Sequence, residues 1–178
     1  LASFTVRRAV SENLSFGVQL SYLDTGVRID SDFLSLLPPA LQPDLDITLG
    51  KLNFLIEYDS RDNTFYPTQG YRADLDLSYS REIDSAFGDK FELATKSYLK
   101  LLASGSFYHE LPNASVIAAR GVFCAAEEDA PFFDTCGLGL ADGVRGFPAL
   151  SYLGNFSASL QAEFRGRFNE RLGYVAFI

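Results

Sequence analysis

The stretch that decides the fold is Phe156-Ser-Ala-Ser-Leu-Gln-Ala-Glu-Phe-Arg165. Apolar residues stand at every second position from Phe156 to Phe164, and polar or charged residues fill the positions between them. Successive side chains of a strand point to opposite faces, so this stretch predicts a strand with one apolar and one polar face. Tyr71-Arg-Ala-Asp-Leu-Asp-Leu-Ser-Tyr-Ser80 repeats the same alternation.

Weaker versions of this pattern recur along the chain and predict an all-β, antiparallel fold. Expected connections are short or moderate around 11–13, 59–70, 103–114 and 169–171, and long at 24–49 and 125–152, although the connection at 82–90 is not long. Short turns at one end and long loops at the other are typical of outer-membrane barrels. The eight expected strands lie near 2–10, 14–23, 50–58, 71–81, 91–102, 115–124, 153–168 and 172–178.

Composition excludes several classes of protein. The 15 basic and 23 acidic residues give a net charge of -8, which argues against a nucleic-acid surface. The longest uncharged apolar stretch, 33–43, is broken by Pro38 and Pro39, so no membrane-spanning helix of ~20 residues is expected. A membrane protein of this sequence would cross with strands. The chain has no Met and opens as if inside a strand, so we interpret it as a piece of a longer product.

The chemistry-bearing residues are few. Cys124 and Cys136 are the only cysteines and His109 is the only histidine, too few for a metal cluster. The cysteines favour a disulfide that closes a loop, with two reduced thiols as the alternative. Activation of a nucleophile usually needs a base such as histidine, and His109 is expected as a satisfied or solvated side chain in a turn before Leu111-Pro112, so we predict neither enzymatic activity nor a cofactor.

Periodicity alone leaves two fold classes open. A soluble β-sandwich or a lipocalin-like barrel also alternates, with its apolar face turned inward. A transmembrane barrel turns that face outward to lipid.

Motifs separate these alternatives. Asp142-Gly-Val-Arg-Gly-Phe-Pro148, in the loop 125–152, resembles the VRGF signature of the BamA-type assembly barrels, the bacterial surface antigen family. Upstream, Tyr58-Asp-Ser-Arg-Asp-Asn63 with Tyr66-Pro67 and Gly70 resembles that family's D-x-R-D-N turn. Downstream, Leu160-Gln-Ala-Glu-Phe-Arg165 and Gly173-Tyr-Val-Ala-Phe-Ile178 are similar to its following strands. The resemblance covers about residues 50 to 178, and residues 1 to 49 add compatible strands.

The resemblance implies that residues 1–178 form one partial transmembrane β-barrel domain, from a barrel of about sixteen strands. POTRA domains and the remaining strands would lie outside this chain. The implied location is the bacterial outer membrane, or an organelle outer membrane of bacterial origin. The implied function is assembly of outer-membrane proteins; the alternatives are a two-partner secretion translocator and a passive pore or structural barrel. Implied partners are the lipid bilayer, unfolded outer-membrane or secreted polypeptides, and periplasmic accessory proteins, without nucleic acid or cofactor.

Two groups of residues carry the expected site. Gly143 and Gly146 let the signature loop fold back tightly around Val144 and Arg145, with Phe147 completing the motif. An arginine that leaves bulk water needs a carboxylate partner, and the resemblance points to Glu163; the alternative is a solvent-exposed arginine. The second group locks a turn rather than performing catalysis. Its members are Asp59, Arg61, Asp62, Asn63, Pro67 and Gly70.

Overall fold

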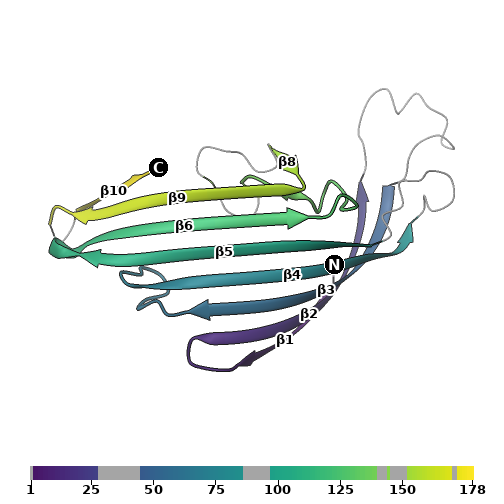
Figure 1. The fold of residues 1–178 in the computed structure, drawn as a ribbon, viewed down its shortest axis with the longest axis horizontal. Helices are drawn as coiled ribbons and strands as arrows, with labels where there is room; N and C mark the ends of the chain where they lie inside the picture. The colour runs from purple at the N-terminus through teal and green to yellow at the C-terminus, as the bar shows by residue number, and fades with distance from the viewer. Residues whose placement is uncertain (1, 28–44, 86–96, 140–143, 145–151, 170–171) are drawn as a thin grey trace.

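The computed structural model describes residues 2–27, 45–85, 97–139, 144, 152–169 and 172–178. They form one eight-stranded antiparallel sheet with a two-stranded ladder beside it (Figure 1). The all-β, antiparallel prediction is confirmed, and the sheet is open, with β1 and β10 at its edges. The described residues contain no helix that is both long and apolar enough to cross a membrane. The strands are β1 (Ala2–Ala9), β2 (Leu14–Val27), β3 (Leu45–Asp59), β4 (Gly70–Ser85), β5 (Ser97–Leu111), β6 (Ser115–Ala126), β7 (Cys136–Gly137), β8 (Leu153–Gly154), β9 (Phe156–Arg167) and β10 (Gly173–Phe177).

Strand order follows chain order with a single break. Each strand pairs with its successor in sequence until β6, which pairs with β9, because β7 and β8 form the separate ladder. The turns before β2, β4 and β6 and the facing ends of β9 and β10 lie together at the left of Figure 1, and the last residues of β2, β4 and β6 lie at the opposite end. We call these the short-turn end and the long-connection end. Strands such as β3, with 15 residues, exceed the ~10 residues that a tilted strand needs to cross a bilayer.

The register gives the sheet two chemically different faces, because residues directly opposite each other share a face. Val6, Val18, Phe54 and Leu77 form one such row, and all are at least 39% exposed. We call their side of the sheet the apolar face. The adjacent row consists of Thr5, Gln19, Asn53 and Ser78 and lies on the opposite side, the polar face.

Hydrogen bonds run between strands across the polar face. Gln19 Nε2 donates to Thr5 Oγ1 at 2.9 Å, and Asn53 Nδ2 donates to Gln19 Oε1 at 2.7 Å. The large exposed side chains therefore gather on one face, while polar side chains form hydrogen bonds with one another on the other. This is the reverse of a soluble sheet packed on an apolar core.

The prediction for β5 is wrong in its position. We expected a strand at 91–102 and a connection at 103–114, but β5 continues to Leu111, and a turn over Pro112–Ala114 follows. Residues 91–96 lie outside the described part of the chain. The composition of Ala103-Ser-Gly-Ser106 predicts a loop, because these residues favour turns. In the structure they belong to β5, and Ser104 and Ser106 lie on its polar face, which accepts small polar side chains. His109 is consequently a strand residue whose ring lies 6.3 Å from that of Phe107.

The hairpin of β2 and β3 is longer than expected, since pairing continues to Val27 and Leu45. Most of the loop predicted at 24–49, residues 28–44, lies outside the described residues. The strand expected at 153–168 is divided into β8 and β9.

Candidate functional site

The segment after β6 folds over the polar face of the sheet. The disulfide between Cys124 and Cys136 ties its return to the end of β6, with a Cα–Cα distance of 5.7 Å. Glu127 binds the start of β5, because its amide donates to the carbonyl of Leu99 at 3.0 Å and its Oε2 accepts from the amide of Leu99 at 2.8 Å. We call residues 126–137 the anchored segment.

Asp134 is the electrostatic centre of the anchored segment. Its carboxylate forms an ion pair with Lys51 of β3 and accepts a hydrogen bond from the hydroxyl of Tyr98 on β5. Lys100 contributes a second ion pair at 3.3 Å from Asp134 Oδ1 and donates to the carbonyl of Thr135 at 3.3 Å. Only 14% of the Asp134 side chain is exposed. The segment is thus held to two different strands by charge.

The pKa of Asp134 reflects two opposing influences. Burial would raise it, but hydrogen bonds from Lys51 and Tyr98 and the charge of Lys100 outweigh burial and hold the pKa below its usual value. Asp134 is therefore ionised at neutral pH. Its charge offsets part of the positive charge that the two lysines place on the polar face.

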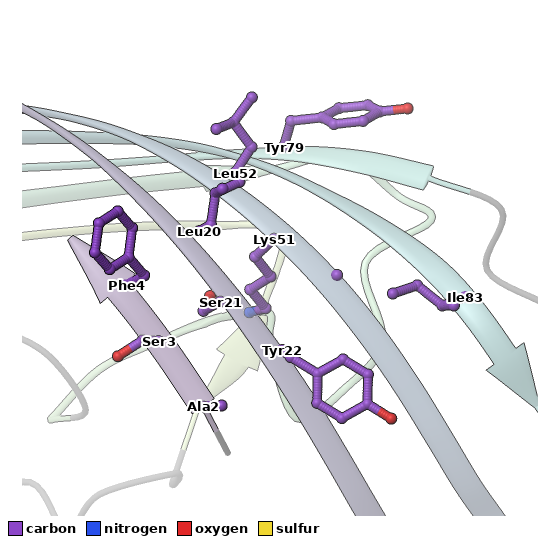
Figure 2. A pocket seen from close by; sticks show the side chains of 11 residues that line it. Ala2, Ser3, Phe4, Leu20, Ser21, Tyr22, Lys51, Leu52, Tyr79 and Ile83 are labelled. Carbon is purple, nitrogen blue, oxygen red and sulfur yellow. The ribbon is translucent and has the colours of Figure 1, made fainter. Parts of the chain in front are cut away.

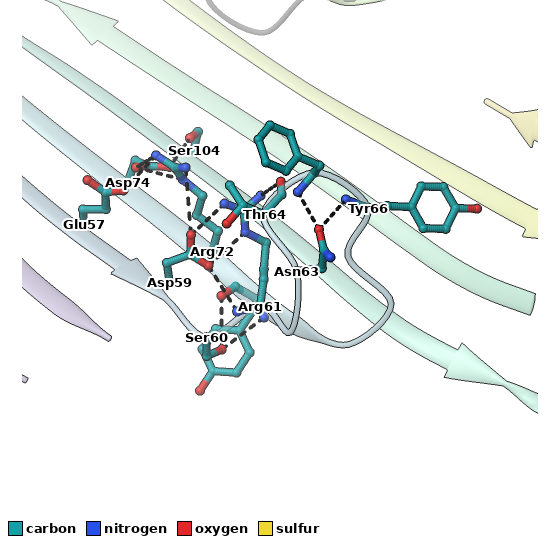
Figure 3. Close-up of polar contacts among 12 residues, drawn as sticks. Glu57, Asp59, Ser60, Arg61, Asn63, Thr64, Tyr66, Arg72, Asp74 and Ser104 are labelled. Atoms are coloured by element: carbon teal, nitrogen blue, oxygen red, sulfur yellow. Dashed lines mark hydrogen bonds and ion pairs between the residues drawn. The ribbon is translucent and has the colours of Figure 1, made fainter. Parts of the chain in front are cut away.

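The turn between β3 and β4 is locked by its own side chains (Figure 3). Arg61 donates three hydrogen bonds to the Asp59 carboxylate, from its amide at 3.1 Å, from Nε at 2.9 Å and from Nη2 at 2.6 Å. Asp62 Oδ1 accepts from the amides of Thr68 at 2.9 Å and Gln69 at 3.0 Å. These bonds close the turn from within.

Hydrogen bonds within the turn also lower the pKa of Asp62. The pKa of Asp62 falls to about 2, chiefly because the amide of Gln69 donates to it, with further hydrogen bonds from Thr68. Asn63 Oδ1 accepts from the amides of Phe65 at 2.8 Å and Tyr66 at 3.0 Å. The turn therefore keeps its shape through carboxylate and amide oxygens that face backbone donors.

Gly70 ends the turn in a conformation that other residues rarely adopt. Its φ is +97°, and a Cβ built there would lie 2.3 Å from the carbonyl oxygen of Ser60. Glycine is required at this position for both reasons.

The turn reaches across the polar face to β9. Arg165 donates to the carbonyl of Pro67 at 3.5 Å, and its guanidinium carbon lies 5.1 Å from the ring centroid of Tyr66 and 5.6 Å from that of Tyr108. Glu163, two residues earlier on the same face, forms an ion pair with Arg165. The sequence placed Glu163 and Arg165 on one face by alternation but gave no signal that the distant turn meets them.

Of the predicted signature-loop residues, Gly143, Arg145, Gly146 and Phe147 lie outside the described part of the chain, so the pairing of Arg145 with Glu163 stays a prediction. Val144 is described and is half-buried. Within the described residues no group of three or more His, Cys, Asp or Glu side chains is arranged to hold a metal ion.

A family model described as the Omp85 superfamily domain matches residues 2–168. The chain belongs to the Omp85 superfamily. Proteins of this superfamily are β-barrels of the bacterial outer membrane or of organellar outer membranes that insert or secrete proteins, and the superfamily covers both BamA and the two-partner translocators. The match begins at residue 2, so the first strands belong to the Omp85 domain as much as the later motifs do. No curated protein matches the chain.

Proposed function

We propose that this chain is part of a BamA-type outer-membrane barrel that assembles or inserts outer-membrane proteins. The supporting observation is the anchored segment, because it leads directly into the signature motif at 142–148 and holds the start of that loop against the polar face. Its partners would be the bilayer, unfolded outer-membrane polypeptides and periplasmic accessory proteins. No enzymatic step or cofactor enters this proposal.

The proposed arrangement turns the apolar face to lipid and the polar face to the lumen. Row after row of exposed Phe, Leu, Val and Tyr supports it, because a face of this kind in water would be a large aggregation-prone patch. Spin labels test it in the full-length protein in liposomes. Labels at Leu160 and Phe164 should be accessible to lipid-soluble quenchers, and labels at Ser159 and Arg165 to water-soluble ones. The opposite pattern would refute the arrangement.

The proposed mechanism places Arg145 in the lumen, bound to Glu163. Glu163 lies on the polar face with its side chain 19% exposed, so an approaching guanidinium would meet a carboxylate already partly removed from water. The carboxylate also serves Arg165, so the loop arginine would join an existing ion pair. Glu163 would then contact the signature loop through Arg145 and the turn before β4 through Arg165.

A double-mutant cycle in the full-length protein tests this pair. Arg145→Ala and Glu163→Ala should each impair assembly and increase protease cleavage of the loop, and the double variant should be little worse than either. Arg167→Ala is the matched control, because Arg167 is an exposed arginine near the end of the same strand. Additive effects of Arg145 and Glu163 would remove the pair from the mechanism.

Secretion of a partner polypeptide is the second candidate function, supported by the same superfamily match and the same type of loop. Reconstitution in liposomes separates the candidates. Assembly predicts that an added unfolded barrel protein becomes folded in the bilayer, and secretion predicts that a partner polypeptide becomes protected inside the vesicle. Ion conductance without either result would identify a passive pore.

A further inference from the structure

The apolar face is hollowed near its β1 edge. A groove of ≈ 510 Å³ crosses β1 to β4 there, and Figure 2 shows the side chains around it. Most of the groove surface is apolar, and Ser3, Ser21 and Lys51 also contribute to its lining. Its walls include Ala2, Phe4, Leu20, Tyr22, Gly50 and Ile83.

The groove exists because one row of facing residues contains two small ones, Ala2 and Gly50. Ala2, Tyr22, Gly50 and Arg81 lie opposite one another, and the neighbouring row carries the large side chains of Phe4, Leu20, Leu52 and Tyr79. A Cβ at Gly50 would lie 2.9 Å from Ile83 Cδ1, so the absent side chain is what leaves room for Ile83 to form the wall.

Arg81 supplies a charge beside this mostly apolar groove. It lies opposite Gly50, exposed on the apolar face, and it forms no ion pair with any residue of the described part of the chain. It is four residues from Ser85, the last residue of β4 at the long-connection end. An arginine that faces lipid is strongly unfavourable at the bilayer midplane and nearly neutral at the interface, so this position near the end of β4 fits the depth of lipid headgroups.

We propose that the groove and Arg81 form a binding site for an anionic phospholipid. One acyl chain lies in the groove between Phe4 and Tyr22, and the phosphate binds the Arg81 guanidinium, whose paired N–H groups match phosphate oxygens. This inference rests on the proposed lipid-facing orientation of the apolar face. A second copy of the chain would need a surface complementary to this groove, whereas a lipid supplies both a flexible apolar tail and a phosphate for the Arg81 guanidinium.

Native mass spectrometry of the full-length protein in detergent tests the headgroup contact, with phosphatidylglycerol and phosphatidylcholine as probes. Arg81→Gln should weaken phosphatidylglycerol binding about fivefold, as expected for the loss of one basic side chain beside anionic lipid, and should change phosphatidylcholine binding less. Arg8→Gln is the matched control, because Arg8 lies opposite Phe16, exposed on the same face, but at the short-turn end. Equal losses in both variants would show general electrostatic attraction and overturn the proposal.

The groove is tested by filling it. Ala2→Leu and Gly50→Leu should each lower the binding of phosphatidylglycerol, and only the Gly50 variant places a new side chain against Ile83 of the groove wall. Ala162→Leu, elsewhere on the apolar face, should leave binding unchanged. Unaltered binding in both groove variants would overturn the proposal, and so would a dimer that disappears when the groove is filled. If spin labels confirm the lipid-facing orientation while Arg81→Gln behaves as Arg8→Gln, this inference alone fails.

Discussion

Replacement of Asp134 by Asn should release the anchored segment from the polar face. The substitution keeps the shape of the side chain and a hydrogen-bond acceptor for Tyr98, but it removes the charge that faces Lys51 and Lys100. The three charged side chains are only 14–20% exposed, so they lie between a surface pair and a buried one. Removal of one charge from an ion pair costs roughly 3–5 kcal/mol when the pair is buried and at most ~1 kcal/mol when it is on the surface. We therefore expect the substitution to destabilise the closed form of the anchored segment by about 2–3 kcal/mol.

That free energy corresponds to roughly a 30- to 150-fold increase in the opening equilibrium of the segment. Hydrogen exchange measures it directly at the amides of Glu127, Ala130 and Asp134, which donate to the carbonyls of Leu99, Glu127 and Pro131 at 3.0, 3.0 and 2.8 Å. Asp129→Asn is the matched control, because Asp129 is an exposed aspartate of the same segment. Equal exchange rates in the two variants would refute the electrostatic account of the anchor.

Acid should loosen the same contact. The folded-state pKa of Asp134 lies below its ordinary value of 3.8, so the stabilisation is complete above that value and is lost as pH falls through the lower folded-state pKa. Protease sensitivity of the anchored segment in the wild-type protein should therefore increase below pH 3.8, and the Asp134→Asn variant should show no such step. A step of equal size in the variant would assign the acid response to another group.

The other predictions concern the turn and the disulfide. Gly70→Ala should destabilise the protein by at least about 2 kcal/mol in chemical unfolding, while the matched Gly105→Ala, whose Cβ would lie 3.9 Å from its nearest neighbour, should change stability by less than about 0.5 kcal/mol. Equal effects would mean that the Gly70 backbone relaxes. Reduction of the Cys124–Cys136 disulfide should increase protease cleavage within the anchored segment, because closing a loop of this size stabilises by roughly 3 kcal/mol in the chain-entropy model. Alkylation of both thiols without reductant would exclude the disulfide. The Gln69 amide NMR signal should titrate with a midpoint of about 2, because Asp62 loses its charge only there, and a midpoint near 4 would contradict the turn geometry.

The fold could be predicted from period-two alternation because a two-faced sheet imposes that period on every strand. The stretches 71–80 and 156–165 carry it without interruption, and β4 and β9 include them. Strand ends were harder to predict. The residues of 103–106 favour turns by composition, yet the polar face of this sheet accepts the same small polar residues inside a strand. Turn propensity is therefore a weak guide wherever one face of a sheet is polar.

The D-x-R-D-N turn could be recognised from sequence because its bonds are local. Asp59 binds Arg61 and Asp62 binds Thr68, so partners lie within a few residues of each other. The long-range contacts of Asp134 and Arg165 could not be recognised in this way. Asp134 lies 83 residues from Lys51, and Arg165 lies 98 residues from Pro67. Such pairs are decided by register across several strands, which a single sequence does not reveal.

The two long-range anchors lie toward opposite ends of the polar face and differ in chemistry. At the long-connection end, the anchored segment is held by a disulfide and by ion pairs to β3 and β5. At the short-turn end, the turn before β4 meets Arg165 through the ring of Tyr66 and the carbonyl of Pro67. The first contact depends on a disulfide and on ion pairs, whereas the second is a cation–π contact and a hydrogen bond to a backbone carbonyl. Reductant should therefore loosen the anchored segment while the turn keeps its contact with Arg165.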